Sequence, residues 1–364
     1  MYPFFRSFLF RLDPETAHQL TLQTLRMAGN FPLSNWFLRQ LYNVPSKPVQ
    51  AFGLTFKNPV GLAAGYDKDG VAIRGLAALG FGHAEIGTVT PRPQPGNPPP
   101  RVFRLVEDEG VINRMGFPGR GAEFVAMSLR SSRSNPPAHE EIASGTSAPR
   151  NDMILGVNLG KNKDTPLEEA AQDYIELMRR FISLSDYLAI NISSPNTVGL
   201  RRLQGRDMLE QLLGAIRKER AITLSFGHPS TMGRGERSSN TPILVKLSPD
   251  LNDEELDDAI GVILDKGMDG IIATNTTLAR EGLRSKYQNE TGGLSGTPLA
   301  AGSEAVLRQV VKLVDGKVPI ISVGGIMSPE DAKKRLACGA SLVQVYTGLV
   351  YRGPKLVQEI VKNI

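Results

Sequence analysis

The fold of this chain is decided by the stretch Tyr187-Leu188-Ala189-Ile190-Asn191-Ile192-Ser193-Ser194-Pro195-Asn196-Thr197. Its first four residues are an apolar run that is typical of a buried strand, and the remainder places amides and hydroxyls in a loop. In (β/α) barrels, the loops that follow the strands carry the chemistry. Asn, Ser and Pro also favour turns for local reasons, so the loop alone does not separate a catalytic segment from a turn.

Seven more apolar runs alternate with amphipathic helical patterns, one of which is expected to begin at Pro166 and another near Asp253. The runs lie at residues 60–64, 84–89, 154–159, 243–247, 270–274, 319–323 and 342–346. Eight such units over about 300 residues predict an α/β fold, a (β/α)8 TIM barrel. A doubly wound sheet is the alternative, but the chain lacks a nucleotide-type glycine motif.

Residues 1–45 differ from the rest, because they combine many Phe and Leu residues and the single Trp with interleaved Arg. Short helices of this kind are typical of a membrane interface, and a helical subdomain that caps the core is the alternative. The predicted domains are therefore a small N-terminal helical extension, 1–45, and a barrel, 46–364. Two stretches rich in Ser, Pro, Gly and charge, 131–152 and 225–241, are expected to be surface insertions.

Composition excludes several classes of function. The net charge of +5 comes from scattered basic residues, so no nucleic-acid partner is expected. One cysteine, Cys338, and four histidines without ligand spacing predict neither a disulfide framework nor a metal site. There is no apolar run of membrane-spanning length, and the N-terminus has neither a signal-peptide nor a transit-peptide pattern.

Polar groups recur at the ends of the predicted strands. Lys68 follows the first strand and is a candidate for holding an anion. Lys246 lies inside an apolar run, where a charge is costly unless it is paired; in a barrel it would face a ligand, and on a misread helix it would face outward. Glycine-rich loops at residues 324–326 and 346–348 follow the last two strands, which is where these barrels bind phosphate. The sequence therefore predicts a phosphorylated ligand.

Six motifs together resemble the class 2, quinone-dependent dihydroorotate dehydrogenases. They lie at residues 63–68, 85–98, 113–117, 191–196, 291–296 and 323–326, and the resemblance covers nearly the whole chain apart from the two insertions. Two rivals remain. One is a soluble class 1-like enzyme that passes electrons to fumarate or NAD, although class 1 relatives carry cysteine where this chain has Ser194 and lack the N-terminal extension. The other is a non-redox barrel that binds a phosphorylated metabolite.

The resemblance implies one FMN per chain and the oxidation of dihydroorotate to orotate, with a quinone as acceptor, in de novo pyrimidine biosynthesis. It implies that Ser194 is the base that removes the C5 proton while hydride passes from C6 to flavin N5. The implied substrate contacts are Lys68, Asn113, Arg114, Met115, Gly116, Phe117, Asn191, Asn196, Asn275 and Thr276. The implied FMN contacts are Ala63, Ala64, Gly65, Tyr66, Asp67, Thr88, Asn158, Asn191, Lys246, Thr274, Gly296, Gly325, Tyr346 and Thr347.

The N-terminal extension resembles the class 2 helical pair that forms a quinone tunnel on the membrane. His18 and Arg104 are then candidate tunnel residues. The resemblance further implies a peripheral protein on the cytoplasmic side of a cell inner membrane, with the mitochondrial inner membrane as the alternative. A monomer is expected.

Overall fold

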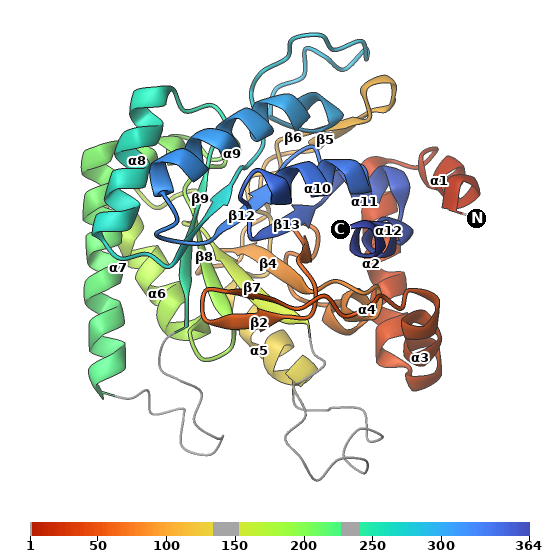
Figure 1. Ribbon diagram of the computed structural model, residues 1–364, viewed down its shortest axis with the longest axis horizontal. Coiled ribbons are helices and arrows are strands. Elements are labelled where there is room, and N and C mark those ends of the chain that lie inside the picture. The colour runs from red at the N-terminus through yellow and green to blue at the C-terminus, as the bar shows by residue number, and fades with distance from the viewer. Residues whose placement is uncertain (1, 134–152, 227–240) are drawn as a thin grey trace.

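The computed structural model describes residues 2–133, 153–226 and 241–364 (Figure 1). Most of the two predicted insertions, residues 134–152 and 227–240, lies outside the described residues. Of their described margins, residues 131–133 end helix α5 (Gly121–Arg133) and residues 225–226 end helix α7 (Arg206–Phe226), whereas Thr241 lies outside any helix or strand.

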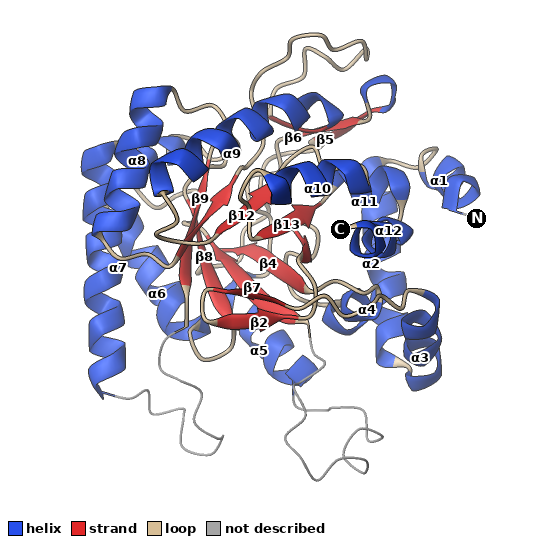
Figure 2. Cartoon of the chain, viewed as in Figure 1, coloured by secondary structure: helices blue, strands red, loops and turns tan. Residues whose placement is uncertain are grey.

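A closed barrel of eight parallel strands forms the centre of the molecule (Figure 2). In chain order the strands are β3 (Val60–Leu62), β4 (His83–Val89), β7 (Ile154–Leu159), β8 (Tyr187–Asn191), β9 (Ile243–Leu247), β10 (Gly270–Ala273), β12 (Ile320–Val323) and β13 (Leu342–Val345). Each predicted run supplies one strand, so the predicted (β/α)8 barrel is confirmed. Because β13 pairs with β3 and closes the ring, the doubly wound alternative is wrong.

Helices surround this barrel and bury its outer face. They are α4 (Ile73–Ala78), α5, α6 (Ala170–Phe181), α7, α8 (Asp253–Asp265), α9 (Ala300–Val314), α10 (Pro329–Ala337), α11 (Thr347–Arg352) and α12 (Lys355–Asn363). Helix α8 begins with a capping box between Asn252 and Glu255, which satisfies backbone N–H groups that would otherwise lack partners. Helix α6 begins at Ala170, so the start predicted at Pro166 is wrong. The backbone bond from Glu169 N–H to the Pro166 carbonyl closes a separate turn before it.

The amino-terminal end of the barrel is closed by a hairpin that the sequence did not reveal. Strands β1 (Val49–Ala51) and β2 (Leu54–Phe56) pair antiparallel. Phe56 is fully buried and belongs to the same apolar cluster as Tyr187, at the start of β8, and Leu244, in β9. The hairpin therefore fills the floor of the barrel, opposite the loops at the carboxyl ends of the strands.

A second sheet, also unpredicted, lies over the carboxyl ends. It contains β5 (Val102–Leu105), β6 (Gly110–Asn113) and β11 (Gly293–Gly296) in the order β11-β6-β5, with the short 3-10 helices η1 (Val106–Asp108) and η4 (Thr297–Leu299) after β5 and β11. In this sheet Gly293 pairs with Asn113, although 180 positions separate them in the chain. The sheet thereby brings two of the recognised motifs to the mouth of the barrel.

Helices α1 (Tyr2–Leu9), α2 (Pro14–Asn30) and α3 (Pro32–Leu41) form the N-terminal extension on one side of the barrel (Figure 1). Helix α2 packs closely against α4, since a Cβ atom on Gly29 would lie 2.3 Å from the backbone nitrogen of Gly75. The extension thus covers part of the barrel, as expected of a capping subdomain. It also exposes large apolar side chains, as expected of helices at a membrane interface: Phe4, Phe5, Phe8, Leu20, Met27, Phe31, Leu33, Trp36, Phe37 and Leu41. Within the described part of the chain, no helix has the length and apolar character needed to span a membrane.

Candidate active site

One continuous cavity of about 650 Å³ joins the carboxyl ends of the barrel strands to the space beside α1 and α2. Its inner end is lined by polar side chains that include Ser194, Asn191 and Lys246. Its outer end is lined by apolar side chains that include Phe5, Leu9 and Leu25. This volume is within the range of pockets for cofactors and small ligands. The cavity offers two chemically different compartments in one space.

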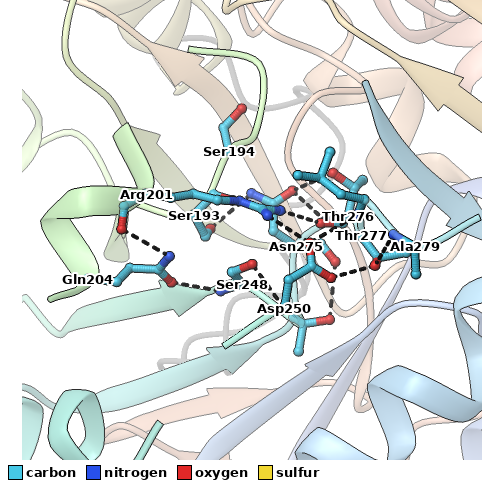
Figure 3. A network of polar contacts seen from close by, with 12 residues as sticks. Ser193, Ser194, Arg201, Gln204, Ser248, Asp250, Asn275, Thr276, Thr277 and Ala279 are labelled. Carbon is cyan, nitrogen blue, oxygen red and sulfur yellow. Dashed lines mark hydrogen bonds and ion pairs between the residues drawn. The ribbon is translucent and has the colours of Figure 1, made fainter. Parts of the chain in front are cut away.

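Ser194 lines the inner end of the cavity, three residues beyond the end of β8. The residue is only 5% exposed, and its Oγ accepts a hydrogen bond from the Asn196 N–H at 3.2 Å. Figure 3 shows the Ser194 side chain directed away from the polar network around Ser193 and Asn275. The hydroxyl is therefore not engaged in that network.

Four amide side chains, all predicted, surround this end of the cavity and hold one another in place. Asn191 Nδ2 donates to Thr88 Oγ1 at 2.9 Å, and Asn275 Nδ2 donates to Ser193 Oγ at 2.9 Å. Asn196 Nδ2 donates to Asn113 Oδ1 at 3.0 Å. The Asn196 Oδ1 atom is buried without a hydrogen-bond partner among the described residues. Because buried polar atoms are normally paired, this acceptor is available to a ligand N–H.

Lys246 points into the barrel and lines the cavity, so the outward alternative is wrong. Its ammonium lies 3.6 Å from Glu85 Oε1, and both residues are buried. Glu85 also accepts hydrogen bonds from Asn158 Nδ2 at 2.7 Å, Gln344 Nε2 at 3.1 Å and the Tyr187 hydroxyl at 3.3 Å. Burial, reinforced by the neighbouring Glu85, raises the pKa of Tyr187 well above its usual value, so this phenol stays a donor.

Glu85 and Gln344 were not among the predicted site residues, although Glu85 begins one of the six motifs. Each lies within an otherwise apolar run. The signal that could have found Glu85 was Lys246, because an ammonium buried in an apolar strand requires a buried group of opposite charge nearby.

Lys68 lies at the rim of the inner end, where its ammonium donates to the Gly65 carbonyl at 2.8 Å. Burial lowers the pKa of Lys68 to about 8, and the carboxylates of Glu15 and Asp69 oppose that shift. The group is therefore cationic at neutral pH and close to the point at which it loses its proton.

The glycine-rich loops predicted to bind phosphate line the cavity together. Gly325 has a φ of +70°, and a Cβ atom there would lie 2.3 Å from Ala300 Cα. Only glycine fits this position without strain. Behind the loop, the buried Arg335 guanidinium donates to the Gly324 carbonyl at 3.1 Å. Across the cavity mouth, the hydroxyls of Ser295 and Thr347 lie 2.8 Å apart.

Three of the predicted contacts do not line the cavity. The Asp67 carboxylate accepts hydrogen bonds from the Val71 and Ala72 N–H groups just before α4, and so shapes the loop. Asn158 lies behind Thr88 and Asn191, to which its Oδ1 is bonded. Arg114 pairs with Glu290 at 2.6 Å, away from the cavity. The other predicted residues line it: Ala63, Ala64, Gly65, Tyr66, Lys68, Thr88, Asn113, Met115, Gly116, Phe117, Asn191, Ser194, Asn196, Lys246, Thr274, Asn275, Thr276, Gly296, Gly325, Tyr346 and Thr347.

His18 and Arg104, the two candidate tunnel residues, line the outer part of the same cavity. The His18 ring packs edge-on against Tyr66, with the ring centroids 4.9 Å apart. Burial, assisted by the nearby Lys68 charge, lowers the pKa of His18 to about 4, so the ring is neutral at pH 7. Arg104 lies over the Phe10 ring at 4.8 Å and donates to the Leu9 carbonyl at 3.0 Å, which ties the second sheet to α1.

A barrel with a filled floor and a glycine-lined polar cavity at its carboxyl ends is the architecture of the (β/α)8 enzymes. Within that class, a family model for dihydroorotate dehydrogenase matches residues 47–364, and this chain belongs to the dihydroorotate dehydrogenase family.

Its relatives resemble it from end to end. The dihydroorotate dehydrogenase (quinone) of Cronobacter sakazakii is 48% identical over 364 residues, which are all of this chain and 99% of the relative. The enzyme of the same name from Escherichia coli is 46% identical over the same span and the same shares. Among solved structures, that of the Eimeria tenella enzyme in complex with ferulenol has a TM-score of 0.84 and 40% identity, covering 98% of this chain and 93% of that one. The resemblance to the class 2 enzymes is thereby confirmed.

Proposed function

We propose that this protein oxidises (S)-dihydroorotate to orotate and passes the electrons, through one FMN, to a quinone, as a step of pyrimidine nucleotide (UMP) biosynthesis. The observation that carries the proposal is that one continuous cavity is polar near Ser194 and apolar beside α1 and α2. A water-soluble substrate suits the first compartment and a lipid-soluble acceptor suits the second. The printed names of the relatives, which cover the chain from end to end, support the same activity.

The inner cavity fits FMN. Backbone at Ala64, Gly65, Gly296 and Gly325 allows a flat ring and a phosphate to approach closely. Lys246, which lines the cavity, would stabilise the negative charge that reduced flavin carries near N1. When bound, FMN would supply the two-electron chemistry that links oxidation of dihydroorotate at C6 to reduction of the quinone.

The chain's own residues would handle the substrate and its proton. Lys68 would pair with the substrate carboxylate, and the amides of Asn113, Asn191, Asn196 and Asn275 would hold the planar ring by hydrogen bonds. Ser194 would then take the proton from C5, leaving orotate with its new C5–C6 double bond. A serine hydroxyl is a weak base, so the reaction depends on near-attack geometry and on an onward path for the proton.

The outer end would receive the quinone. His18, being neutral, and Arg104 would contact the quinone ring, while the exposed aromatic side chains of α1 and α3 would enter a membrane surface. The enzyme would then be a monomer bound peripherally to the cytoplasmic face of a bacterial inner membrane, with a mitochondrial inner membrane as the alternative. In this arrangement residues 1–45 are the membrane and quinone module, and residues 46–364 are the FMN barrel.

The test is a visible spectrum of the purified protein followed by anaerobic titration with dihydroorotate. The expected result is flavin absorbance that bleaches on titration and returns when a soluble ubiquinone analogue is added. A colourless protein that binds no FMN would favour the non-redox barrel. Reoxidation by fumarate or NAD, but not by quinone, would favour the class 1-like enzyme.

A further inference from the structure

One guanidinium joins the three loops that surround the substrate position, and the proposed function gives it no task. Arg201 lies in the 3-10 helix η2 (Leu200–Gln204), in the segment between β8 and α7. Its Nε donates to the Ser193 carbonyl at 3.1 Å, and its Nη2 donates to the Thr276 carbonyl at 2.9 Å (Figure 3). Ser193 immediately precedes the proposed base, and Thr276 immediately follows the substrate amide Asn275.

Asp250, from the loop between β9 and α8, completes the arrangement. Its carboxylate accepts from Arg201 Nη1 at 2.7 Å and from the Leu278 N–H at 2.9 Å, and it also accepts a hydrogen bond from the Thr277 hydroxyl. The segment that carries Arg201 is fastened to the same loop a second time, because Gln204 Oε1 accepts from the Ser248 N–H at 2.9 Å. The loops after β8, β9 and β10 are thus joined through one ion pair.

This ion pair differs from an ordinary surface contact. The side chains of Arg201 and Asp250 are 21% and 24% exposed, and Arg201 directs the three donors described above to three separate loops. By contrast, Arg206 and Asp258 are 58% and 35% exposed and join two helices far from the cavity. Exposed pairs of the second kind contribute little to stability or geometry.

We infer that Arg201, with Asp250 as its counterion, is a positioning residue that sets the distance between the Ser194 hydroxyl and the Asn275 amide. The inference rests on the proposed function, because it assumes that Ser194 takes the proton and that Asn275 holds the substrate. Arg201 fixes the backbone of both loops one residue away from each of these groups. A displacement of about 1 Å between base and substrate lowers a rate by about a hundredfold, even when binding persists.

The experiment measures single-turnover flavin bleaching by saturating dihydroorotate in five holoenzyme variants: Arg201→Gln, Arg201→Lys, Asp250→Asn, the double variant Arg201→Gln/Asp250→Asn and, as matched control, Arg206→Gln. We expect Arg201→Gln to slow bleaching about 10- to 100-fold, with orotate affinity changed less than about fivefold. Arg201→Lys should recover part of the rate, because an ammonium reaches only some of the three acceptors. The double variant Arg201→Gln/Asp250→Asn should be little slower than either single variant, since the two side chains act as one unit.

A second readout separates positioning from general damage. Reoxidation of the reduced flavin by quinone would not use the Ser194 loop, so its rate should equal that of the wild type in all five variants. Wild-type bleaching kinetics in Arg201→Gln would overturn the inference. So would equal slowing of bleaching and reoxidation, or a protein that purifies without FMN. Failure of the wild-type protein to bleach would instead refute the proposed function itself.

Discussion

The two ends of the cavity are built in opposite ways. At the inner end, buried polar side chains fix one another: Glu85 alone accepts hydrogen bonds from three side chains and lies 3.6 Å from the Lys246 ammonium. At the outer end, α3 contains no buried residue and α2 contains only Ala17 and Gly29. The inner end is suited to one ligand geometry, because every group has a set direction. The outer end offers apolar area without fixed direction, which suits a flexible, lipid-soluble partner.

The largest expected effect belongs to the inner end. Ser194→Ala should slow flavin bleaching by dihydroorotate by about 10²–10⁴-fold, the range for loss of a proton-transfer group. FMN should stay bound, since the phosphate loops are untouched. Stopped-flow absorbance would measure the rate. The control is Ser132→Ala, which removes a hydroxyl that donates to the Leu129 carbonyl within α5. Bleaching at the wild-type rate in Ser194→Ala would remove the serine from the mechanism.

The second-largest effect is expected at the outer end of the cavity, where substitutions in α3 should weaken membrane binding without changing the chemistry at the inner end. Leu33, Trp36 and Phe37 of α3 are 79%, 58% and 59% exposed. Replacing all three by Glu should lower binding to anionic phospholipid vesicles by at least about a hundredfold, because burying each side chain is worth about 1.5–3 kcal/mol. Co-sedimentation measures binding, and Met127→Glu, an exposed apolar residue on α5, is the control. Bleaching by dihydroorotate should be normal. Undiminished vesicle binding by the triple variant would exclude α3 from the membrane surface.

A third test uses a pair of variants to measure how the buried charges of Lys246 and Glu85 affect the proposed flavin. Lys246→Met should lower the midpoint potential of bound FMN, and Glu85→Gln should raise it, since one removes a positive charge and the other a negative one. Shifts of roughly 30–60 mV correspond to about 1.4–2.8 kcal/mol for a two-electron couple. Spectroelectrochemical titration gives the potentials. Shifts of the same sign would show that packing, not charge, controls the flavin.

The smallest effect is a pH dependence at the rim. Burial lowers the pKa of Lys68 to about 8, so its side chain is positively charged below that pH and loses its proton above it. Only the charged form would pair with the orotate carboxylate. Orotate affinity of the oxidised enzyme should therefore be level below pH 8 and fall about tenfold per pH unit above it. Lys68→Met should bind orotate weakly, with no such fall. A wild-type affinity that stays constant to pH 10 would contradict this role. Fluorescence titration of the flavin provides the measurement.

The barrel was predictable because each of its strands has a recognisable local sequence pattern. Runs such as Ile243 to Leu247 are short and almost wholly apolar, as strands covered by helices must be. The inward direction of Lys246 followed from the same rule, since a charge in such a run needs a buried partner. The position of Ser194 at the end of β8 was readable for that reason too.

The remaining features depend on contacts between distant segments. Strand β11 pairs with β6 across 180 residues, and neither has a pattern that names its partner. Likewise, the role of Glu85 as the partner of Lys246 is visible only in the folded barrel, where β4 and β9 place the two side chains close together. Arg201 and Asp250 were not predicted as site residues, because their contacts form only when the loops after β8, β9 and β10 have come together. Asp67 lay in a recognised motif, yet its carboxylate turned toward its own backbone.

The contact between Gly29 and Gly75 leaves no room for a side chain where α2 packs against α4. A single methyl group at either position would force α2 away from α4 without changing any residue that lines the cavity. Under the proposed function, moving α2 would disturb the outer end of the cavity, where His18 and Leu25 lie, and would slow reoxidation by quinone more than bleaching by dihydroorotate. Two glycines outside the cavity would thus influence the proposed route to the electron acceptor.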